Sequence, residues 1–223
     1  MPVENPPRPS RDVVGRLARL PTATIANALD DVGKRVNCPV ALRPVAPGMT
    51  FAGTAVTVEV IAGEAGSYSS ADFRVGAMID AALAGDVIVV SAQGARASAW
   101  GGMASLAAKL KGVAGLVVDG GVRDIDEMVE HEFPVFARHP VATTGRTRLK
   151  VNAINVPIEI DGVGVHPGDV IVADSTGIVV VPSEHAGPVA ELAERYASED
   201  RNAEAEIRAG LGFSDAMAKF RRI

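Results

Sequence analysis

The chain has 223 residues, 48% of them hydrophobic, and a formal net charge of −5 at pH 7, which predicts a single domain around one sizeable core. The acidic balance argues against the broad cationic surface that DNA or RNA binding usually needs. Cys38 is the only cysteine, so an internal disulfide framework is excluded and a reducing compartment, by default the cytoplasm, is expected. No apolar run approaches about 18 residues, and no signal-peptide core precedes residue 10, so neither membrane insertion nor secretion is predicted.

The first predicted elements are an arm and two short helices. Residues 1–9 are rich in proline and poor in apolar side chains, which predicts a flexible N-terminal arm; residues 10–223 then form the single domain. Ser10 can cap the first helix. Thr22 or Thr24 can cap the second.

Residues 53–118 alternate between β-branched segments and segments with helical spacing of apolar side chains. This alternation predicts at least one parallel crossover unit, in which ligands usually bind at the carboxyl ends of the strands. The predicted order is strand 53–61, a helix between Ser69 and Gly85, strand 86–90, helix 102–110 and strand 113–118. In helix 102–110 the expected inward stripe consists of Met103, Leu106, Ala107 and Leu110.

The second half is richer in strands, which would complete a mixed sheet or sandwich. The predicted strands cover residues 134–137, 156–160, 170–173 and 177–181. From Ser183 to Ala209 the sequence is rich in Ala, Glu and Arg, which predicts a C-terminal helix with Ser183 as its cap. A helix of that length often reaches a neighbouring subunit.

The run Gly101-Gly102-Met103-Ala104 stands at the start of the predicted helix 102–110. Glycines let the backbone approach a ligand closely, and the unpaired N–H groups and positive dipole end of a helix attract carboxylate or phosphate. The run therefore permits an anion cradle. The same glycines could equally form a tight turn with no ligand.

Arg123 and Asp124 follow the apolar run 115–118 and a flexible Asp-Gly-Gly segment, so they are expected at the carboxyl end of a strand. Arg123 can grip a carboxylate with paired donors, and Asp124 can hold a hard cation such as Mg²⁺ directly or through water. A keto acid bound between them would have its carbonyl polarised. The alternative is an exposed ion pair or a helix cap.

Other chemistries have less support in the sequence. The histidines show no pair at the spacing of a zinc-binding helix face. Cys38 has no identifiable base, and there is no Gly-x-Ser-x-Gly elbow, so a nucleophilic hydrolase is not predicted. A Schiff base would need Lys109 or Lys150 in an apolar pocket, and no dinucleotide fingerprint follows a strand.

The run 101–124, together with residues 85–90 and 168–182, resembles the family that contains 4-hydroxy-4-methyl-2-oxoglutarate aldolases and the regulators of ribonuclease activity A (RraA). The resemblance covers the chain from about residue 22 to 210. It implies an α/β fold, a swivelling β/β/α-type single domain with a mixed central sheet and a C-terminal helix. It also implies a homotrimer or a hexamer of two trimers, with active sites between subunits.

In such aldolases a divalent metal and an arginine hold pyruvate, and main-chain amides of the glycine-rich segment hold its carboxylate. The resemblance thus implies a Mg²⁺- or Mn²⁺-dependent (class II) aldolase that cleaves a 4-hydroxy-2-oxo acid to pyruvate, and it allows oxaloacetate decarboxylation. Carried onto this sequence, Gly101, Gly102, Met103 and Ala104 would form the substrate cradle. Arg123 would bind the substrate, and Asp124 would be the catalytic, metal-linked carboxylate.

Position 102 departs from the family pattern. Many of these aldolases carry an acid there that orders metal-bound water, whereas this chain has Gly102, and loss of such a partner commonly weakens metal affinity or activity. The chain could thus act on another substrate, be a decarboxylase, or be a non-catalytic binding protein resembling ribonuclease E regulators. The resemblance allows Glu199 of a neighbouring C-terminal helix to supply an acid, although Asp200 or Glu204 could equally do so.

Overall fold

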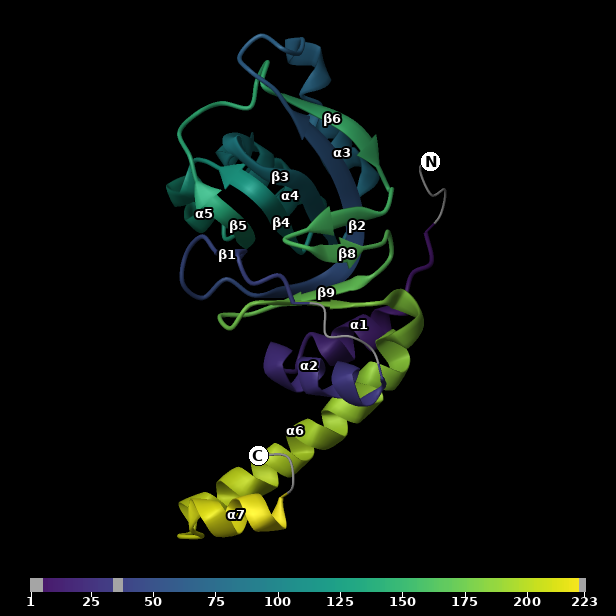
Figure 1. Cartoon of the computed structure of the whole chain (residues 1–223), viewed down its shortest axis with the longest axis vertical. Coiled ribbons are helices and arrows are strands. Elements are labelled where there is room, and N and C mark those ends of the chain that lie inside the picture. The colour runs from purple at the N-terminus through teal and green to yellow at the C-terminus, as the bar shows by residue number, and fades with distance from the viewer. Residues whose placement is uncertain (1–5, 34–37, 221–223) are drawn as a thin grey trace.

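An eight-stranded mixed sheet organises the fold in a computed structural model, which describes residues 6–33 and 38–220 (Figure 1). Its strand order is β1-β5-β4-β3-β2-β9-β10, with β6 also paired to β2. Strands β2 to β5 run parallel, and the others are antiparallel to their neighbours. The strands are β1 (Arg43–Pro44), β2 (Phe51–Ala62), β3 (Asp86–Trp100), β4 (Gly115–Val122), β5 (Val135–Pro140), β6 (Leu149–Ile154), β9 (Val170–Ala173) and β10 (Ile178–Val181), with β7 (Ile158–Ile160) and β8 (Val163–Val165) as a separate ribbon.

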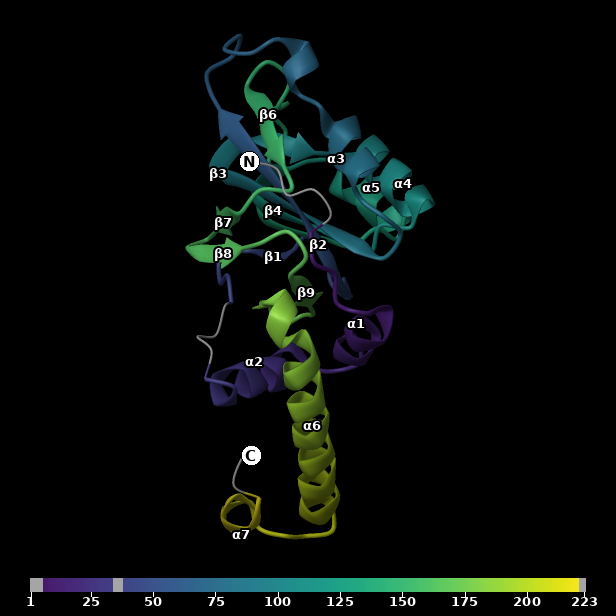
Figure 2. The same cartoon turned by 90° about the vertical axis from the view of Figure 1, so that its right-hand side faces the viewer.

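Helices connect the parallel strands and cover one face of the sheet. Figure 2 shows α3, α4 and α5 together on that face, with the β7–β8 ribbon on the other. Helices α1, α2 and α6 lie beyond the end of the sheet formed by β9 and β10, and α6 extends away from the sheet to α7. The helices are α1 (Arg11–Leu17), α2 (Thr22–Asp31), α3 (Val75–Ala81), α4 (Gly102–Lys111), α5 (Ile125–Glu130), α6 (Ala186–Arg208) and α7 (Phe213–Lys219), with 3-10 turns η1 (Ser70–Asp72) and η2 (Ser183–His185).

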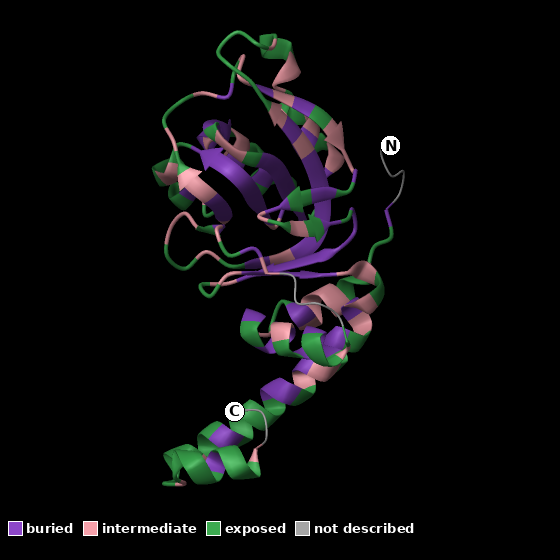
Figure 3. Cartoon of the chain, in the orientation of Figure 1, coloured by how far each residue is buried: buried purple, intermediate pink, exposed green. Residues whose placement is uncertain are grey.

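The predicted parallel crossover is confirmed, and it repeats. Strand β2 leads through α3 to β3, β3 through α4 to β4, and β4 through α5 to β5. Every residue of β4, β9 and β10 is buried, which explains why β9, β10 and the first half of β4 are continuous apolar runs. Figure 3 shows burial concentrated in the strands, whereas α7 and the end of α6 are largely exposed.

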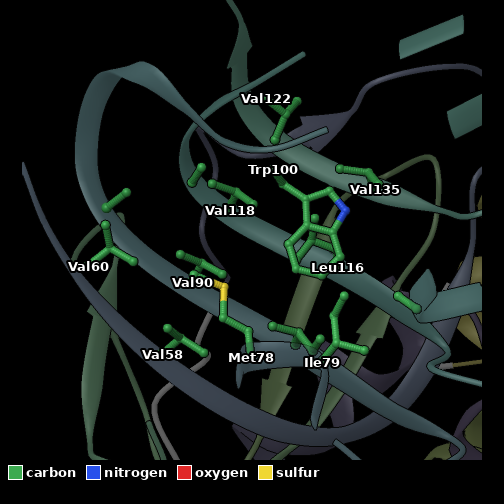
Figure 4. Packing of buried hydrophobic residues seen from close by; sticks show 14 of the residues in the cluster. Val58, Val60, Met78, Ile79, Val90, Trp100, Leu116, Val118, Val122 and Val135 are labelled. Carbon is green, nitrogen blue, oxygen red and sulfur yellow. The ribbon is translucent and has the colours of Figure 1, made fainter. Parts of the chain in front are cut away.

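Trp100, at the end of β3, ties the sheet to the start of α4. Its indole is 2% exposed, lies in the main core cluster (Figure 4) and stacks on Phe133 with ring centroids 6.3 Å apart. The indole Nε1 donates to Ser105 Oγ at 3.0 Å. A buried Trp N–H needs such a partner, so this bond fixes the first turn of α4 against the sheet.

The predicted inward stripe of this helix is wrong. Its buried residues are Gly102, Ser105 and Ala108, while Met103 and Leu110 are 74% and 80% exposed. Small side chains let α4 lie close to the sheet, and Ser105 is needed there as the partner of the indole. The larger apolar side chains consequently face outward.

Two of the three predicted helix caps differ from the structure. Ser10 does cap α1, accepting from Val13 N–H at 3.3 Å. Helix α2 has no cap from a threonine side chain; instead Asp174 accepts from the N–H of Thr22 at 2.9 Å and its hydroxyl at 2.8 Å. Ser183 begins η2 rather than capping α6, whose N-cap position is occupied by His185.

The N-terminal segment contacts the domain where it is described. Pro6 is buried, and Arg8 forms an ion pair with Asp86 at the start of β3. Residues 1–5 of the predicted arm lie outside the described residues. Strands β1, β6 and β8 and helix α7 were not predicted. Among residues 6–33 and 38–220, no helix has the length and apolar character that a membrane span requires.

Candidate active site

The site lies where two neighbouring parallel strands end. Strand β3 ends at Trp100 and β4 at Val122, and these two residues are partners in the sheet register. Arg123 N–H donates to the Trp100 carbonyl at 3.1 Å. Because both strands run in the same direction, the segments that follow them, at the starts of α4 and α5, must lie side by side.

A pocket of about 200 Å³ opens at this point. Every predicted site residue except Glu199 lines it: Gly101, Gly102, Met103, Ala104, Arg123 and Asp124. The walls also contain residues that sequence reasoning missed: Phe73, Val75, Ser98, Trp100 and Thr144. Phe73 and Val75 follow β2, so the rule that loops after parallel strands share one edge could have found them.

Asp124 is held in an unusual backbone conformation. Its φ and ψ are 60° and 45°, in the left-handed region, which costs a non-glycine residue about 1–3 kcal/mol and is tolerated best by Asp and Asn. Asp124 is the N-cap residue of α5, yet its side chain makes no capping hydrogen bond. Its Oδ2 instead accepts from Gly102 N–H at 3.2 Å and lies 3.4 Å from Arg123 Nε, which aims the carboxylate at the pocket.

Gly101 is required by the close approach of these side chains. A Cβ at this position would lie 2.6 Å from Asp124 Oδ2 and 3.4 Å from Arg123 Nε. The first hydrogen bond within α4 runs from Ser105 N–H to the Gly101 carbonyl at 3.1 Å, so the N–H groups of Met103 and Ala104 precede it and are not used by the helix. The cradle thus combines a carboxylate, a guanidinium and two helix-start amides.

These groups fit a hard divalent cation with a small anion. Arg123 and Asp124 are 45% and 37% exposed, so both reach solvent and a ligand. Mg²⁺ is usually bound through one or two carboxylates, with water and substrate oxygens completing its coordination. Within residues 6–33 and 38–220, no three His, Cys, Asp or Glu side chains converge as a metal site on their own, so Asp124 would be a protein ligand in such an open site.

The chain does not bring Glu199 to its own pocket. Glu199 and Asp200 are exposed on α6, which packs on α1 and α2 at the far edge of the sheet (Figure 1). Glu204 accepts from Arg208 Nε at 2.9 Å on the same helix. A contribution of Glu199 from a neighbouring subunit stays a prediction.

A second charged cluster lies beside the β7–β8 ribbon. Arg138 donates to Asp119 at 2.6 Å and to Asp161 at 2.9 Å, and Asp161 also accepts from the N–H groups of Val40 and Ala41, each at 2.8 Å. The hydrogen bond from Ala41, with help from Arg138, holds the pKa of Asp161 below its usual value although burial opposes it. Such a fully paired cluster stabilises the fold.

Comparison with known proteins agrees with this architecture. A family model described as RraA-like (Aldolase/RraA) matches residues 22–180. A Halalkalibacterium halodurans protein named "Putative 4-hydroxy-4-methyl-2-oxoglutarate aldolase" is 32% identical over 197 residues, covering 88% of this chain and 89% of that protein. An uncharacterized protein of Methanocaldococcus jannaschii is 40% identical over 118 residues, and that match spans 53% of this chain and 56% of the relative.

A solved structure is similar over almost its whole length. Streptomyces coelicolor RraAS2, described as an unusual member of the RNase ES inhibitor RraA protein family, superposes with a TM-score of 0.80 and 29% identity, covering 91% of this chain and 99% of the other. The curled mixed sheet, its crossover helices and the C-terminal helix therefore define an α/β domain of the predicted class. The chain belongs to the RraA-like family, whose relatives bear the names of both aldolases and ribonuclease inhibitors.

Proposed function

We propose that the chain is a divalent-metal-dependent aldolase, a carbon–carbon lyase that cleaves a 4-hydroxy-2-oxo acid such as 4-hydroxy-4-methyl-2-oxoglutarate to pyruvate. The observation that carries the proposal is the pocket in which Arg123, Asp124 and the start of α4 meet. The proposal is also supported by a relative that is named as a putative aldolase of this kind and that matches this chain over nearly its full length.

The substrate carboxylate would lie between Arg123 and the free amides of Met103 and Ala104. A guanidinium binds a carboxylate through paired, charge-assisted hydrogen bonds, and the N–H groups and dipole of α4 favour the same negative charge. Trp100 and Phe73 form an apolar wall of the pocket. This wall excludes water from one side of the substrate, which strengthens the electrostatic interactions within the pocket.

Cleavage breaks the bond between C3 and C4 of the substrate. The 4-hydroxyl loses its proton as its carbon becomes a carbonyl, and the bonding electrons pass through C3 to the oxo oxygen at C2. Asp124 would hold Mg²⁺ or Mn²⁺, directly or through water, and the ion when bound supplies stabilisation of that oxygen's negative charge. Protonation at C3 then gives pyruvate. Decarboxylation of oxaloacetate develops the same charge, so the site could also perform it.

We also propose that the chain forms a homo-oligomer, a trimer or a pair of trimers; its exposed apolar side chains support contact between subunits. Met103 and Leu110 project from α4, and Phe213 and Met217 from α7, each at least half exposed. Exposed apolar residues gathered on protruding elements are typical of subunit contacts. Met103 also lines the pocket, so an interface on α4 would lie next to the site.

A non-catalytic binding protein is the second candidate. The likeness to Streptomyces coelicolor RraAS2 favours it, and a ribonuclease regulator needs only a surface. Gly102 also keeps this candidate open, because it leaves position 102 without an acid.

Pyruvate release separates the two candidates. We expect release from 4-hydroxy-4-methyl-2-oxoglutarate and oxaloacetate that requires Mg²⁺ or Mn²⁺ and stops with a chelator. Arg123→Ala should lower kcat/KM by about 10²–10³, the usual effect of removing one charge-stabilising donor. Arg96→Ala, also at an exposed arginine, is the control and should retain activity. Near-normal kcat/KM in Arg123→Ala would refute the site, and a wild type that captures a ribonuclease without metal-dependent turnover would favour the regulator.

A further inference from the structure

Glu127, in the first turn of α5, occupies the space that a side chain at position 102 would need. A Cβ built on Gly102 would lie 2.5 Å from the carboxyl carbon and 2.7 Å from the Cβ of Glu127, and closer still to its Oε2. Real Cβ atoms essentially never approach other atoms so closely. The glycine at 102 therefore leaves room for a carboxylate that comes from another helix.

This position is not the usual one for a glutamate at the start of a helix. Asp124 is the N-cap of α5 and Glu127 is three residues on, which is the spacing of a capping box, where the glutamate returns to the N-cap N–H. Helix α5 has no side-chain cap. The Glu127 side chain extends across to Gly102 in α4 instead, so it serves the neighbouring helix start rather than its own.

Asp124 and Glu127 thus converge on one glycine. Asp124 Oδ2 accepts from the N–H of Gly102, and Glu127 Oε2 lies where a Cβ on the same residue would be. Two carboxylates brought together repel each other unless a positive group lies between or beside them. Arg123 lies 3.4 Å from Asp124, and the positive end of α4 points to both acids. A divalent cation at the mouth of this pocket would complete the balance of charge.

We propose that Glu127 is the second carboxylate of this metal site and orients water bound to the cation that Asp124 holds. It would supply from α5 the acid that position 102 lacks. Glu127 is a positioning residue in this scheme, because it acts through water and not on the substrate. The inference rests on the metal site of the proposed function.

Binding of Mn²⁺ to the full-length protein tests this role without any turnover. Glu127→Gln keeps the shape of the side chain and removes its charge. We expect its Kd for Mn²⁺, measured from the electron paramagnetic resonance signal of free Mn²⁺, to rise about 10- to 100-fold, as for loss of other groups that support a metal ligand. Asp126→Asn removes the same charge from the same helical turn and should change the Kd less than about twofold because solvent screens it. Asp126 and Glu127 are both exposed and neither lines the pocket itself, but it is Glu127 that a Cβ at Gly102 would meet.

Moving the carboxylate from position 127 to position 102 provides the second test. Glu127→Gly removes both the carboxylate and the Cβ contact, and adding Gly102→Asp places an acid in the vacated space. We expect the double variant to bind Mn²⁺ more tightly than Glu127→Gly alone, with Tm measured for both variants to show that each is folded. Equal Kd values for these two variants would contradict the proposed exchange of positions.

The outcomes separate the inference from the proposed function. If Glu127→Gln binds Mn²⁺ as tightly as Asp126→Asn, Glu127 has no role at the metal site and the inference is wrong. If the wild type binds no Mn²⁺, both the inference and the metal-dependent aldolase are wrong. If the wild type binds Mn²⁺ in a Glu127-dependent way yet releases no pyruvate, the site assignment stands and the aldolase proposal fails.

Discussion

Replacing Gly102 by alanine should destabilise the protein, although the same change elsewhere in a helix normally stabilises it. Gly102 begins α4 and its backbone is that of an ordinary helix start, so helix propensity favours alanine by up to about 1 kcal/mol. The added methyl group would, however, stand 2.7 Å from the Cβ of Glu127. That atom is fixed to the α5 backbone, so relief requires α5 to move and not only a change of side-chain rotamer.

The expected size follows from these two opposing effects. Inserting one methyl group into a space already filled costs about 1–3 kcal/mol, and the gain in helix propensity offsets up to about 1 kcal/mol of it. The net fall in the free energy of unfolding lies between about 0 and 3 kcal/mol, and we expect about 1–2 kcal/mol, the middle of that range. For a chain of this size each kcal/mol changes Tm by about 2–4 °C, so Gly102→Ala should lower Tm by about 2–8 °C.

Thermal unfolding followed by circular dichroism measures this shift, and the chain offers a matched control. Gly187 also lies in the first turn of a helix, α6, and a Cβ there meets nothing within 4 Å. Gly187→Ala should therefore leave Tm unchanged or raise it. In a Glu127→Gly background, Gly102→Ala should lose its cost because the opposing Cβ is gone. A rise in Tm for Gly102→Ala comparable with that of Gly187→Ala would refute the close contact.

Two further predictions concern stability and assembly. The depressed pKa of Asp161 means that its ionised form stabilises the folded chain above about pH 4 and loses this effect as pH falls below. Asp161→Asn should then cost about 1–3 kcal/mol at pH 7, and urea unfolding should show the gap closing towards pH 3; a constant gap would contradict it. Leu110→Glu and Met217→Glu, at exposed positions, should reduce the particle mass in light scattering, whereas an unchanged oligomer would argue against these contacts.

The strands that lie wholly inside the sheet were the most predictable part of the fold. Strand β9 has the predicted bounds, 170–173, because a short run of β-branched residues between turns has few other favourable environments. Strand β3 was predicted only to residue 90, yet it continues to Trp100. Gln93 and Gly94 both have positive φ, and the register with β4 shifts there. An irregularly paired strand lacks a regular alternation of apolar and polar residues, so the continuation of β3 beyond residue 90 could not be predicted from the sequence.

Helix α4 shows why apolar spacing alone can assign the wrong face. Met103 and Leu110 have the spacing of a core stripe, but the inner face is set by the contact of Ser105 with the Trp100 indole. Burial of the indole demands a hydrogen-bond acceptor, and only the fold shows which residue supplies it. Met103 and Leu110 therefore lie on the outer face of α4. A neighbouring subunit would cover them in the proposed homo-oligomer.

Some residues of the candidate site could be predicted from the local sequence, whereas the position of Glu127 depends on how the helices pack. Arg123 and Asp124 could be assigned because a polar pair after a buried strand must emerge at the carboxyl edge of a parallel sheet. Glu127 could not, because its spacing from Asp124 equally fits a capping box within α5. Which of the two contacts it makes depends on how α5 lies against α4, and this follows from the pairing of β3 with β4. The proposed role of Glu127 would supply from α5 the acid that position 102 lacks, and the Mn²⁺ measurements on Glu127→Gln decide whether Gly102 counts against metal-dependent chemistry.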